Sequence, residues 1–430
     1  MFEIKRREKM VERALLVGAY TDSAGKVDAE DLLNELGELV RTLRVPVVGR
    51  LLAYNREPQA RLLVGSGKAE EIRDRARELS CDVIVFDNEL TPAQQRNWEN
   101  LTGITVIDRQ EIILDIFGAR AQTREARIQV DLARMTYSLP RLTRAWGHLG
   151  KQGGGIGSKG EGESQLEQDK RKIRGQMDRL RRDLTEVRRN RATQRKDRKR
   201  APVPNAAIVG YTNAGKSSLL RRLTGADVLV EDALFATLDT TTRKIDLPNR
   251  QPLLLTDTVG FIRKLPHQLV ESFNATLEEA VLADFLIHLL DASHPRVLEF
   301  YDTTVKVLAD LGAEQKPTLT VFNKIDRVKD PLTRVLLRQR HPEALFVSVH
   351  SGEGLDTLVS RLAGFFDEGA REVILHLPHD RTDLIARLHR EGVVHETDYE
   401  PEFVRIRATV QDRLRDSLAP FVLLEAQAPG

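Results

Sequence analysis

A glycine-rich turn near the middle of the chain reads Gly210-Tyr-Thr-Asn-Ala-Gly-Lys-Ser217, and it lies between the apolar run Ala206–Val209 and the helical pattern Leu219–Leu223. At a turn from strand to helix, such glycines let backbone N–H groups converge on phosphate oxygens. Lys216 then reaches the β- and γ-phosphates, and the Ser217 hydroxyl ligates Mg²⁺. The segment therefore predicts a phosphate-binding P-loop in an α/β domain.

The residues around this turn alternate between apolar runs and helical patterns. The further apolar runs are Leu253–Thr256, Phe285–Leu290, Leu319–Phe322 and Leu345–Val349. This alternation is typical of a doubly wound, mostly parallel sheet. Because Ala201-Pro-Val-Pro204 breaks the preceding helical pattern, we expect this domain over residues 201–368.

Polar motifs follow three of these runs, at the strand ends where open α/β sheets bind ligands. In Asp257-Thr-Val-Gly260, the aspartate is placed to hold Mg²⁺ through water and the Gly260 N–H to sense the γ-phosphate. In Asn323-Lys-Ile-Asp326, a carboxylate can accept hydrogen bonds from the guanine N1–H and N2 amine, which adenine lacks. Ser348-Val-His350 would place a backbone N–H near the guanine O6. Together the motifs predict GTP as the nucleotide.

The loop Phe235–Arg243 separates the P-loop helix from the strand before Asp257. One of its four threonines is expected to close on Mg²⁺ when the γ-phosphate is present and to release it after hydrolysis. Spacing alone does not choose among the four.

Two residues bear on the hydrolysis rate. Phe261 stands where many GTPases carry a glutamine that orients water, so we expect slow intrinsic hydrolysis unless another group or a partner supplies that role. Asn213 occupies a position that potassium-activated GTPases use to ligate K⁺, and the alternative is an asparagine that only caps the turn.

Residues 1–108 predict a small α/β domain, and residues 109–200 predict an antiparallel helical hairpin whose glycine-rich tip is Gly147–Gly162. Residues that are apolar except for one glutamate recur at alternating steps of four and three in both helices, as in the seam of a coiled coil. These seam residues are Ala121, Glu125, Ile128, Leu132, Met135 and Leu139 in the first helix, and Ile173, Met177, Leu180, Leu184 and Val187 in the second. Residues 369–430 predict a small α+β domain.

Charge is concentrated in the second helix of this hairpin. Ser164–Arg200 holds 15 Lys or Arg against six Asp or Glu, a net of +9 in a chain of net +2, which leaves −7 elsewhere. Such a segment is a common footprint of nucleic-acid contact, although a solvated basic helix without a partner has the same composition.

Composition bounds the remaining possibilities. Hydrophobic residues make up 41% and charged residues 30% of the chain, as in soluble globular proteins. We see no apolar run of membrane-spanning length and no secretory signal, and the single Cys81 cannot form an internal disulfide. A cytoplasmic protein, monomeric when free, is expected.

The motifs resemble those of the HflX GTPases. The resemblance rests on Gly210-Tyr-Thr-Asn-Ala-Gly-Lys-Ser217, on Phe-Ala-Thr-Leu-Asp239 and on Asp257-Thr-Val-Gly-Phe-Ile-Arg-Lys-Leu-Pro-His267. It extends upstream through Val64-Gly-Ser-Gly-Lys-Ala-Glu-Glu71 and Gly153-Gly-Gly-Ile-Gly157, and covers about residues 11–365.

This resemblance implies a GTPase that binds the large ribosomal subunit and ribosomal RNA and separates the subunits of stalled or stressed ribosomes. It implies Thr237 as the Mg²⁺ threonine, beside Ser217 and Asp257, and Asn323 and Asp326 as base readers. Lys216 and Asn213 are the candidate catalytic residues, with Mg²⁺ as the ion and with K⁺ as a second ion if Asn213 ligates it. The sequence departs from the family pattern at Thr240, at Glu161 in the glycine tip and at Val349.

The full set of expected nucleotide contacts is Gly210, Tyr211, Thr212, Asn213, Ala214, Gly215, Lys216, Ser217, Ser218, Phe235, Ala236, Thr237, Leu238, Asp239, Asp257, Thr258, Val259, Gly260, Asn323, Lys324, Ile325, Asp326, Ser348, Val349 and His350.

Two alternatives stay open. The chain could be an RNA-binding assembly or remodelling factor in which GTP sets affinity and no splitting occurs. It could also act as an ATP-dependent RNA helicase through the turn Gly65-Ser-Gly-Lys68, which otherwise is only a helix start.

Overall fold

A computed structural model describes residues 12–144, 161–198, 203–225, 234–235, 237–249, 251–264, 279–367, 370–411 and 418–426. The described residues divide between two compact units. The first unit takes those of Met1–Ala192, Val230–Asp239 and Val259–Leu277, and the second those of Thr193–Leu229, Thr240–Thr258 and Glu278–Gly430. The first part of the loop Phe235–Arg243, which we call the switch loop, thus belongs with the N-terminal residues, and so does the described segment 259–264.

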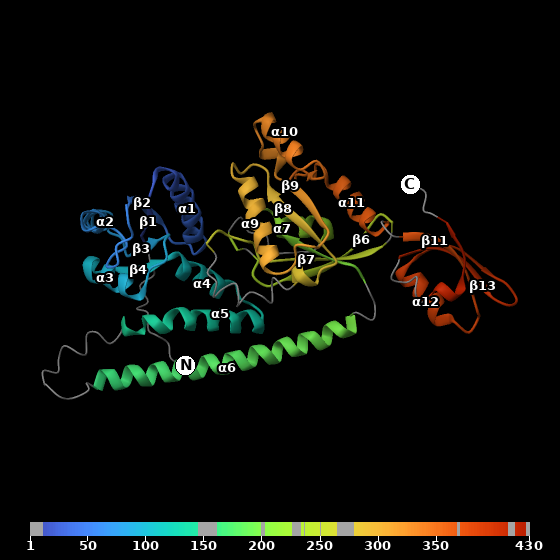
Figure 1. Cartoon of the computed structure of the whole chain (residues 1–430), viewed down its shortest axis with the longest axis horizontal. Coiled ribbons are helices and arrows are strands. Elements are labelled where there is room, and N and C mark those ends of the chain that lie inside the picture. Colours follow the sequence, from blue (N-terminus) through green and yellow to red (C-terminus); the bar gives the residue numbers. More distant parts are fainter. Residues whose placement is uncertain are drawn as a thin grey trace. The chain divides into compact units, whose positions relative to one another are not determined.

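The first unit contains a parallel four-stranded sheet of order β2-β1-β3-β4 (Figure 1). Leu15 and Val17 alternate with Leu16, so that both faces of the central strand are buried under helices. Strands and helices alternate along this part of the chain, as the prediction of a small α/β domain requires. The elements are β1 Ala14–Tyr20, α1 Ser23–Thr42, β2 Val47–Tyr54, α2 Ser66–Glu78, β3 Val83–Phe86, α3 Pro92–Thr102, β4 Thr105–Asp108 and α4 Arg109–Arg120.

The first arm of the predicted hairpin is not one long helix. It consists of α4, then α5 (Arg124–Ser138), then the 3₁₀ turn η1 (Leu139–Arg144). Ala121 has an extended backbone with ψ 110°, and the Thr123 side chain caps a new helix by accepting from Ala126 N, which explains the break. The predicted seam from Ala121 to Leu139 was therefore wrong as a continuous stripe.

Burial in α5 follows the predicted seam only in part. The buried set includes Ile128 of that seam together with Ala126, Val130, Ala133 and Tyr137, whereas Leu132 and Met135 are half-buried. The Tyr137 hydroxyl donates to Asp108 at 3.0 Å, so this face packs toward the end of β4 rather than along a simple two-helix seam.

The second arm, α6, spans Glu161–Arg198 as one 38-residue helix. Its predicted seam is confirmed, because Met177 and Leu184 are buried and Ile173, Leu180 and Val187 are half-buried between exposed charges. Residues 145–160, which hold most of the predicted glycine tip, lie outside the described residues.

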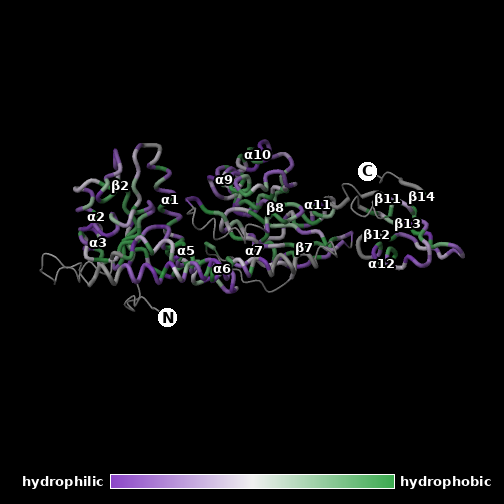
Figure 2. Tube along the Cα trace, turned by 60° about the horizontal axis from the view of Figure 1, so that its bottom comes forward, coloured by the Kyte–Doolittle hydropathy of each residue, from purple (hydrophilic) through white to green (hydrophobic). Residues whose placement is uncertain are grey.

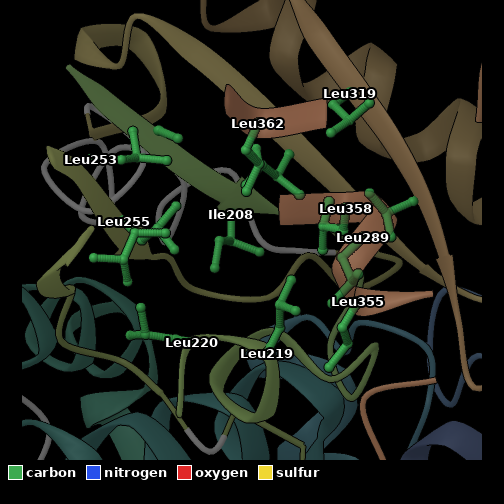
Figure 3. Close-up of a cluster of buried hydrophobic side chains, with 14 of the residues drawn as sticks. Ile208, Leu219, Leu220, Leu253, Leu255, Leu289, Leu319, Leu355, Leu358 and Leu362 are labelled. Carbon is green, nitrogen blue, oxygen red and sulfur yellow. The ribbon is translucent and has the colours of Figure 1, made fainter. Parts of the chain in front are cut away.

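The second unit contains a six-stranded sheet of order β10-β9-β8-β5-β7-β6, parallel except for β6. Leucines of α7 and α11 pack with strand residues such as Ile208 and Leu289 on one face (Figure 3), and the ring of His288 stacks on Tyr301 of α9 on the other. The elements are β5 Asn205–Val209, α7 Lys216–Thr224, β6 Thr241–Asp246, β7 Pro252–Asp257, β8 Phe285–Asp291, α9 Val297–Asp310, β9 Thr318–Asn323, η2 Ile325–Arg327, α10 Pro331–Arg340, β10 Leu345–Phe346 and α11 Leu355–Asp367.

Two strands of this sheet differ from expectation. Strand β6 was not predicted, because as an edge strand it buries only one side and its sequence Thr-Thr-Arg-Lys-Ile-Asp is mostly polar. Strand β10 covers two residues of the predicted Leu345–Val349, because after Val347 the chain turns away and Ser348 N bonds to Glu353 O.

The C-terminal residues form an antiparallel sheet of order β12-β13-β11-β14 with one helix on it. The combination of strands and a helix agrees with the α+β domain predicted for residues 369–430, and residues 412–417 lie outside the described part. The elements are β11 Ala370–Leu377, α12 Thr382–Glu391, β12 Val393–Tyr399, β13 Val404–Gln411, η3 Ala419–Phe421 and β14 Val422–Ala426.

Hydropathy follows this layering in each sheet, with hydrophobic residues gathered in the central strands and hydrophilic residues on outlying helices and turns (Figure 2). Among the described helices, none combines the length and the apolar character needed to cross a bilayer.

Candidate nucleotide site

The P-loop follows β5 and ends where α7 begins at Lys216. Gly210 has φ 146° and Gly215 has φ 99°, both in the region that favours glycine. A Cβ at Gly210 would overlap the Leu289 carbonyl oxygen, and one at Gly215 would lie 2.5 Å from Asn323 Nδ2. The two glycines are therefore required by backbone conformation and by space.

Lys216 is buried inside this loop. Its Nζ donates to the carbonyls of Gly210 at 3.2 Å and Tyr211 at 3.0 Å. The pKa of Lys216 is lowered to about 8, mainly by burial. The nearby Asp257 carboxylate opposes this shift, and the charge of Lys324 contributes to it. A phosphate entering the loop would restore the charged form, since an anion favours the ammonium.

Ser217 and Asp257 meet at the end of β7. The Ser217 hydroxyl donates to Asp257 Oδ2 at 2.6 Å, and the Asp257 side chain is fully buried. A hydroxyl and a carboxylate oxygen side by side, next to a phosphate-binding loop, are the hard oxygen donors that Mg²⁺ prefers. These residues fit a magnesium ion. In the described part of the chain no group of three His, Cys, Asp or Glu side chains could hold another metal.

Asn323 joins the P-loop to the loop after β10. Its Nδ2 donates to the Ala214 carbonyl at 2.8 Å, and its Oδ1 accepts from Val349 N at 3.0 Å. Lys324, in a left-handed conformation with φ 61°, adds a bond from Nζ to the Asn213 carbonyl at 2.7 Å. The side chains predicted to read the base thus also fix the shape of the phosphate loop.

Asp326 points its carboxylate toward solvent at the same edge of the sheet. Its Oδ1 accepts from the buried Ser348 hydroxyl at 2.6 Å, and this hydrogen bond keeps the pKa of Asp326 below its ordinary value. The residue is therefore an oriented, ionised acceptor, as recognition of guanine N1–H and N2 requires.

Asn213 is exposed at the tip of the P-loop with φ 59°. Asparagine tolerates this left-handed conformation better than most residues, so the turn-capping interpretation fits the backbone. Its side chain remains compatible with the potassium interpretation.

In the first unit, the predicted switch loop is attached to the helical segments. Phe235 is buried, and its ring meets Phe117 of α4 edge-on with centroids 4.6 Å apart. Asp239 accepts from Gln122 N at 2.8 Å, from Thr123 N at 3.1 Å and from Thr123 Oγ1 at 2.5 Å. Thr237 is half-buried between these two attachments, and Ala236 lies outside the described residues.

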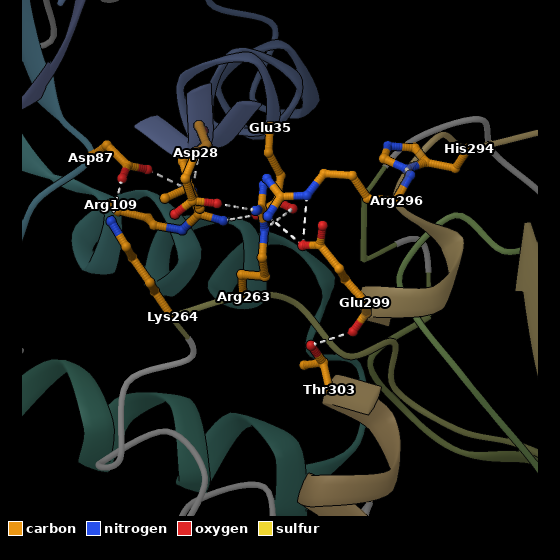
Figure 4. Close-up of polar contacts among 11 residues, drawn as sticks. Asp28, Glu35, Asp87, Arg109, Arg263, Lys264, His294, Arg296, Glu299 and Thr303 are labelled. Atoms are coloured by element: carbon orange, nitrogen blue, oxygen red, sulfur yellow. Dashed lines mark hydrogen bonds and ion pairs between the residues drawn. The ribbon is translucent and has the colours of Figure 1, made fainter. Parts of the chain in front are cut away.

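The segment 259–264, which follows the Asp257 motif, forms ion pairs with α1 and with the residue after β3. Arg263 Nη1 lies 2.8 Å from Asp28 Oδ1, and Lys264 Nζ lies 2.7 Å from Asp87 Oδ2 (Figure 4). Buried Arg109 pairs with Asp87 at 2.7 Å and also with Glu35. Sequence reasoning missed this ion-pair cluster, because its members are far apart in the chain and no local pattern relates them. Phe261, just before, is buried and apolar.

The helix-start turn at Gly65 shows no built phosphate site. Ser66 begins α2, and Lys68 Nζ pairs with Glu71 Oε1 of the same helix at 2.7 Å. No heavy atom lies within 4 Å of a Cβ built at Gly65 or Gly67, so neither glycine is needed for close approach. The helicase interpretation stays a prediction.

Comparison with known proteins covers nearly the whole chain. Family models match at residues 30–118 (GTP-binding GTPase N-terminal), 120–198 (GTP-binding GTPase Middle Region) and 205–324 (50S ribosome-binding GTPase). A GTPase HflX of Akkermansia muciniphila is 48% identical over 98% of this chain and 99% of its own length. A GTPase HflX of Chlamydia pneumoniae is 41% identical, over 98% and 90%. A solved complex of SsGBP and GDP is 24% identical, covers 82% of this chain and 98% of that one, and has a TM-score of 0.48.

Proposed function

This chain belongs to the HflX family of GTPases, and we propose that its GTP cycle governs binding to the large ribosomal subunit and the separation of stalled or stressed ribosomes. The observation that carries the ribosomal part is α6, whose apolar seam is buried or half-buried while its described basic side chains at positions 171, 172, 174, 179, 181, 182 and 189 are exposed. The description of the family model matched at residues 205–324, a 50S ribosome-binding GTPase, supports the same partner. A cytoplasmic protein that is monomeric when free fits this role.

In this proposal the phosphates of GTP enter the loop between Gly210 and Ser217. The Lys216 ammonium exchanges its two carbonyl partners for phosphate oxygens, and α7 directs its N-terminal N–H groups at them. Ser217, Thr237 and, through water, Asp257 would hold Mg²⁺. When bound, the ion would neutralise charge on the β- and γ-phosphate oxygens.

Guanine recognition falls to Asp326, with Asn323 beside it. The Ser348 hydroxyl occupies one oxygen of Asp326 and so orients the other. Guanine offers two donors to such a carboxylate and adenine offers none, which gives selectivity for GTP. Asn213 either ligates K⁺ near the phosphates or caps the turn, and hydrolysis rates in K⁺ and Na⁺ buffers distinguish the two.

Hydrolysis is proposed to depend on the ribosomal partner. Phe261 offers no polar atom with which to orient water. We expect large subunits to raise GTP hydrolysis well above the intrinsic rate, and the absence of stimulation at saturating subunits would overturn the proposal.

Sedimentation of purified ribosomes with the protein tests the splitting step. We expect subunits to separate with GTP or a non-hydrolysable analogue and to stay joined with GDP. Lys216→Ala is the matched control, since it removes the phosphate contact. If the protein co-sediments with intact ribosomes under all conditions, the exposed charge of α6 supports the alternative of a GTP-gated RNA-binding assembly factor instead.

A further inference from the structure

The last residue of β8, Asp291, is linked to the P-loop through a lysine. Its Oδ2 lies 2.8 Å from Lys324 Nζ, and the two side chains are only 20% and 17% exposed. The same Nζ donates to the Asn213 carbonyl at 2.7 Å. Lys324 is therefore held at two points, and it connects Asp291 to the tip of the P-loop. Asp291 belongs to none of the motifs that predict a nucleotide contact.

The orientation of the Asp291 carboxylate is fixed by its own loop. Its Oδ1 accepts from the Ser293 N–H at 3.0 Å and from the Ser293 hydroxyl at 2.6 Å. The Ala292 N–H donates to the Asn323 carbonyl at 2.8 Å, so the loop is also bonded to the residue before Lys324. With Oδ1 engaged in this way, Oδ2 is the oxygen that pairs with the lysine.

Both partners of the Lys324 side chain lie next to strained backbone. Lys324 itself has φ 61° and Asn213 has φ 59°. Residues other than glycine adopt this left-handed conformation at a cost, so surrounding contacts must maintain it. The ion pair with Asp291 and the hydrogen bond to the Asn213 carbonyl are contacts of this kind.

A second contact holds the residue that follows Gly210. The buried rings of Tyr211 and Phe300 of α9 stack in parallel, with centroids 3.9 Å apart and an interplanar angle of 1°. The ring of His294 lies 4.5 Å from Phe300 on the loop before α9. The residues Asp291–Phe300, which we call the β8–α9 segment, thus contact the P-loop at Tyr211 and, through Lys324, at its tip.

We propose that the β8–α9 segment positions the P-loop for the nucleotide. Asp291 acts through Lys324. Phe300 acts through Tyr211. This inference rests on the nucleotide site proposed above. A phosphate loop that is ordered before binding loses less conformational freedom when the nucleotide enters, so the nucleotide is bound more tightly. GTP and GDP share the α- and β-phosphates and should benefit alike, whereas discrimination between bases is the task of Asp326, which lies outside the segment.

Dissociation of N-methylanthraniloyl-GDP from the full chain tests the role of Asp291. We expect Asp291→Asn to raise the dissociation rate about tenfold, as for the loss of one charge-assisted hydrogen bond. Asp291→Glu keeps the charge and should restore part of the loss. In a Lys324→Met background, Asp291→Asn should have no further effect, because its action passes through the lysine. An equal rise in both backgrounds would contradict this role and indicate a contribution confined to the loop of Asp291.

Phe300→Leu tests the second contact, and it does so even if Asp291→Asn does not fold. The loss of an aromatic pair should raise the dissociation rate about threefold, with no further effect in a Tyr211→Leu background. Two matched controls make the same chemical changes elsewhere in this sheet and should leave the rate unchanged. Asp246→Asn removes an exposed ion pair with Lys244 on β6, and Phe285→Leu alters the opposite end of β8. Circular dichroism establishes that each variant is folded.

The remaining outcomes separate the two claims. The ratio of the affinities for GTP and inosine triphosphate should be the same in Asp291→Asn as in the unmodified protein. A changed ratio, or unchanged dissociation in both Asp291→Asn and Phe300→Leu, would overturn the inference and leave the nucleotide site intact. If Lys216→Ala binds the analogue as tightly as the unmodified protein, the proposed nucleotide site falls, and the inference with it.

Discussion

The carboxylate of Asp239 accepts two hydrogen bonds from Thr123, the N-cap residue of α5. One comes from the backbone N–H, at 3.1 Å, and the other from the hydroxyl, at 2.5 Å. Asp239 ends the Phe-Ala-Thr-Leu-Asp motif, and Thr123 is the N-cap residue that precedes α5. The predicted switch loop is thereby attached to the helical segments.

Asp239→Ala should loosen this attachment without unfolding α5, because the Thr123 hydroxyl still accepts from Ala126 N. Hydrogen bonds to a charged acceptor contribute about 1.5–3 kcal/mol, so amide exchange in the peptide containing Gln122 and Thr123 should speed up by about tenfold or more. Hydrogen–deuterium exchange measures this, with Asp246→Ala on the exposed edge strand β6 as control. Unchanged exchange would mean that the contact contributes little.

Nucleotide affinity should fall as pH rises above about 8. The Lys216 pKa is about 8 in the absence of nucleotide, and bound phosphate raises it, so binding takes up a proton at higher pH. Between these two pKa values the affinity falls by up to about tenfold per pH unit, and below pH 8 it is flat with respect to this group. Calorimetric titration in buffers of different ionisation enthalpy detects the proton. Lys216→Met should bind weakly and show no uptake; a flat profile for the unchanged protein contradicts the assignment.

Arg109→Met should destabilise the N-terminal sheet by up to about 3–5 kcal/mol, because Asp87 and Glu35 lose their shared cation and keep only Lys264 and Arg263, respectively, as cationic neighbours. Chemical denaturation measures the change. Arg41→Met removes an exposed partner of Glu38 and should cost less than about 1 kcal/mol. Equal losses in the two variants would show that the buried cluster has no special role in stability.

Asp326→Asn should reduce GTP affinity at least about a hundredfold, since two charge-assisted hydrogen bonds to guanine are lost. Xanthosine triphosphate, which carries a carbonyl at C2, should bind this variant better than GTP because an amide can donate to it. Competition binding with both nucleotides checks the exchange of preference. Asp310→Asn, an exposed change at the end of α9, should preserve the preference for GTP.

Local signals predicted the sheets and the loops at their edges. The apolar run before Gly210 and the turn that follows require a strand and a phosphate loop through residue chemistry alone, and both are present. Strand β6 was not predicted, because a polar edge strand has almost no hydrophobic pattern in its sequence. The break at Ala121 was missed because Ala121 has the same spacing of fours and threes as the residues of α5 that follow it.

Long-range attachments were beyond sequence reasoning for a different reason. Arg263 and Asp28, or Asp239 and Thr123, are single charged or polar residues whose partners lie more than a hundred positions away. Nothing local distinguishes them from ordinary surface residues. Asn323 was predicted only in part. Its motif predicted a base reader, whereas its hydrogen bond to the P-loop carbonyl of Ala214 was found only in the structure.

The length of α6 has a mechanical consequence. At about 1.5 Å per residue, its 38 residues extend over about 57 Å. A rigid rod of that length works as a lever, since a rotation of only about 5° at one end displaces the other by about 5 Å. A rotation of that size at one end would therefore be enough to break or re-form a polar contact made at the other end.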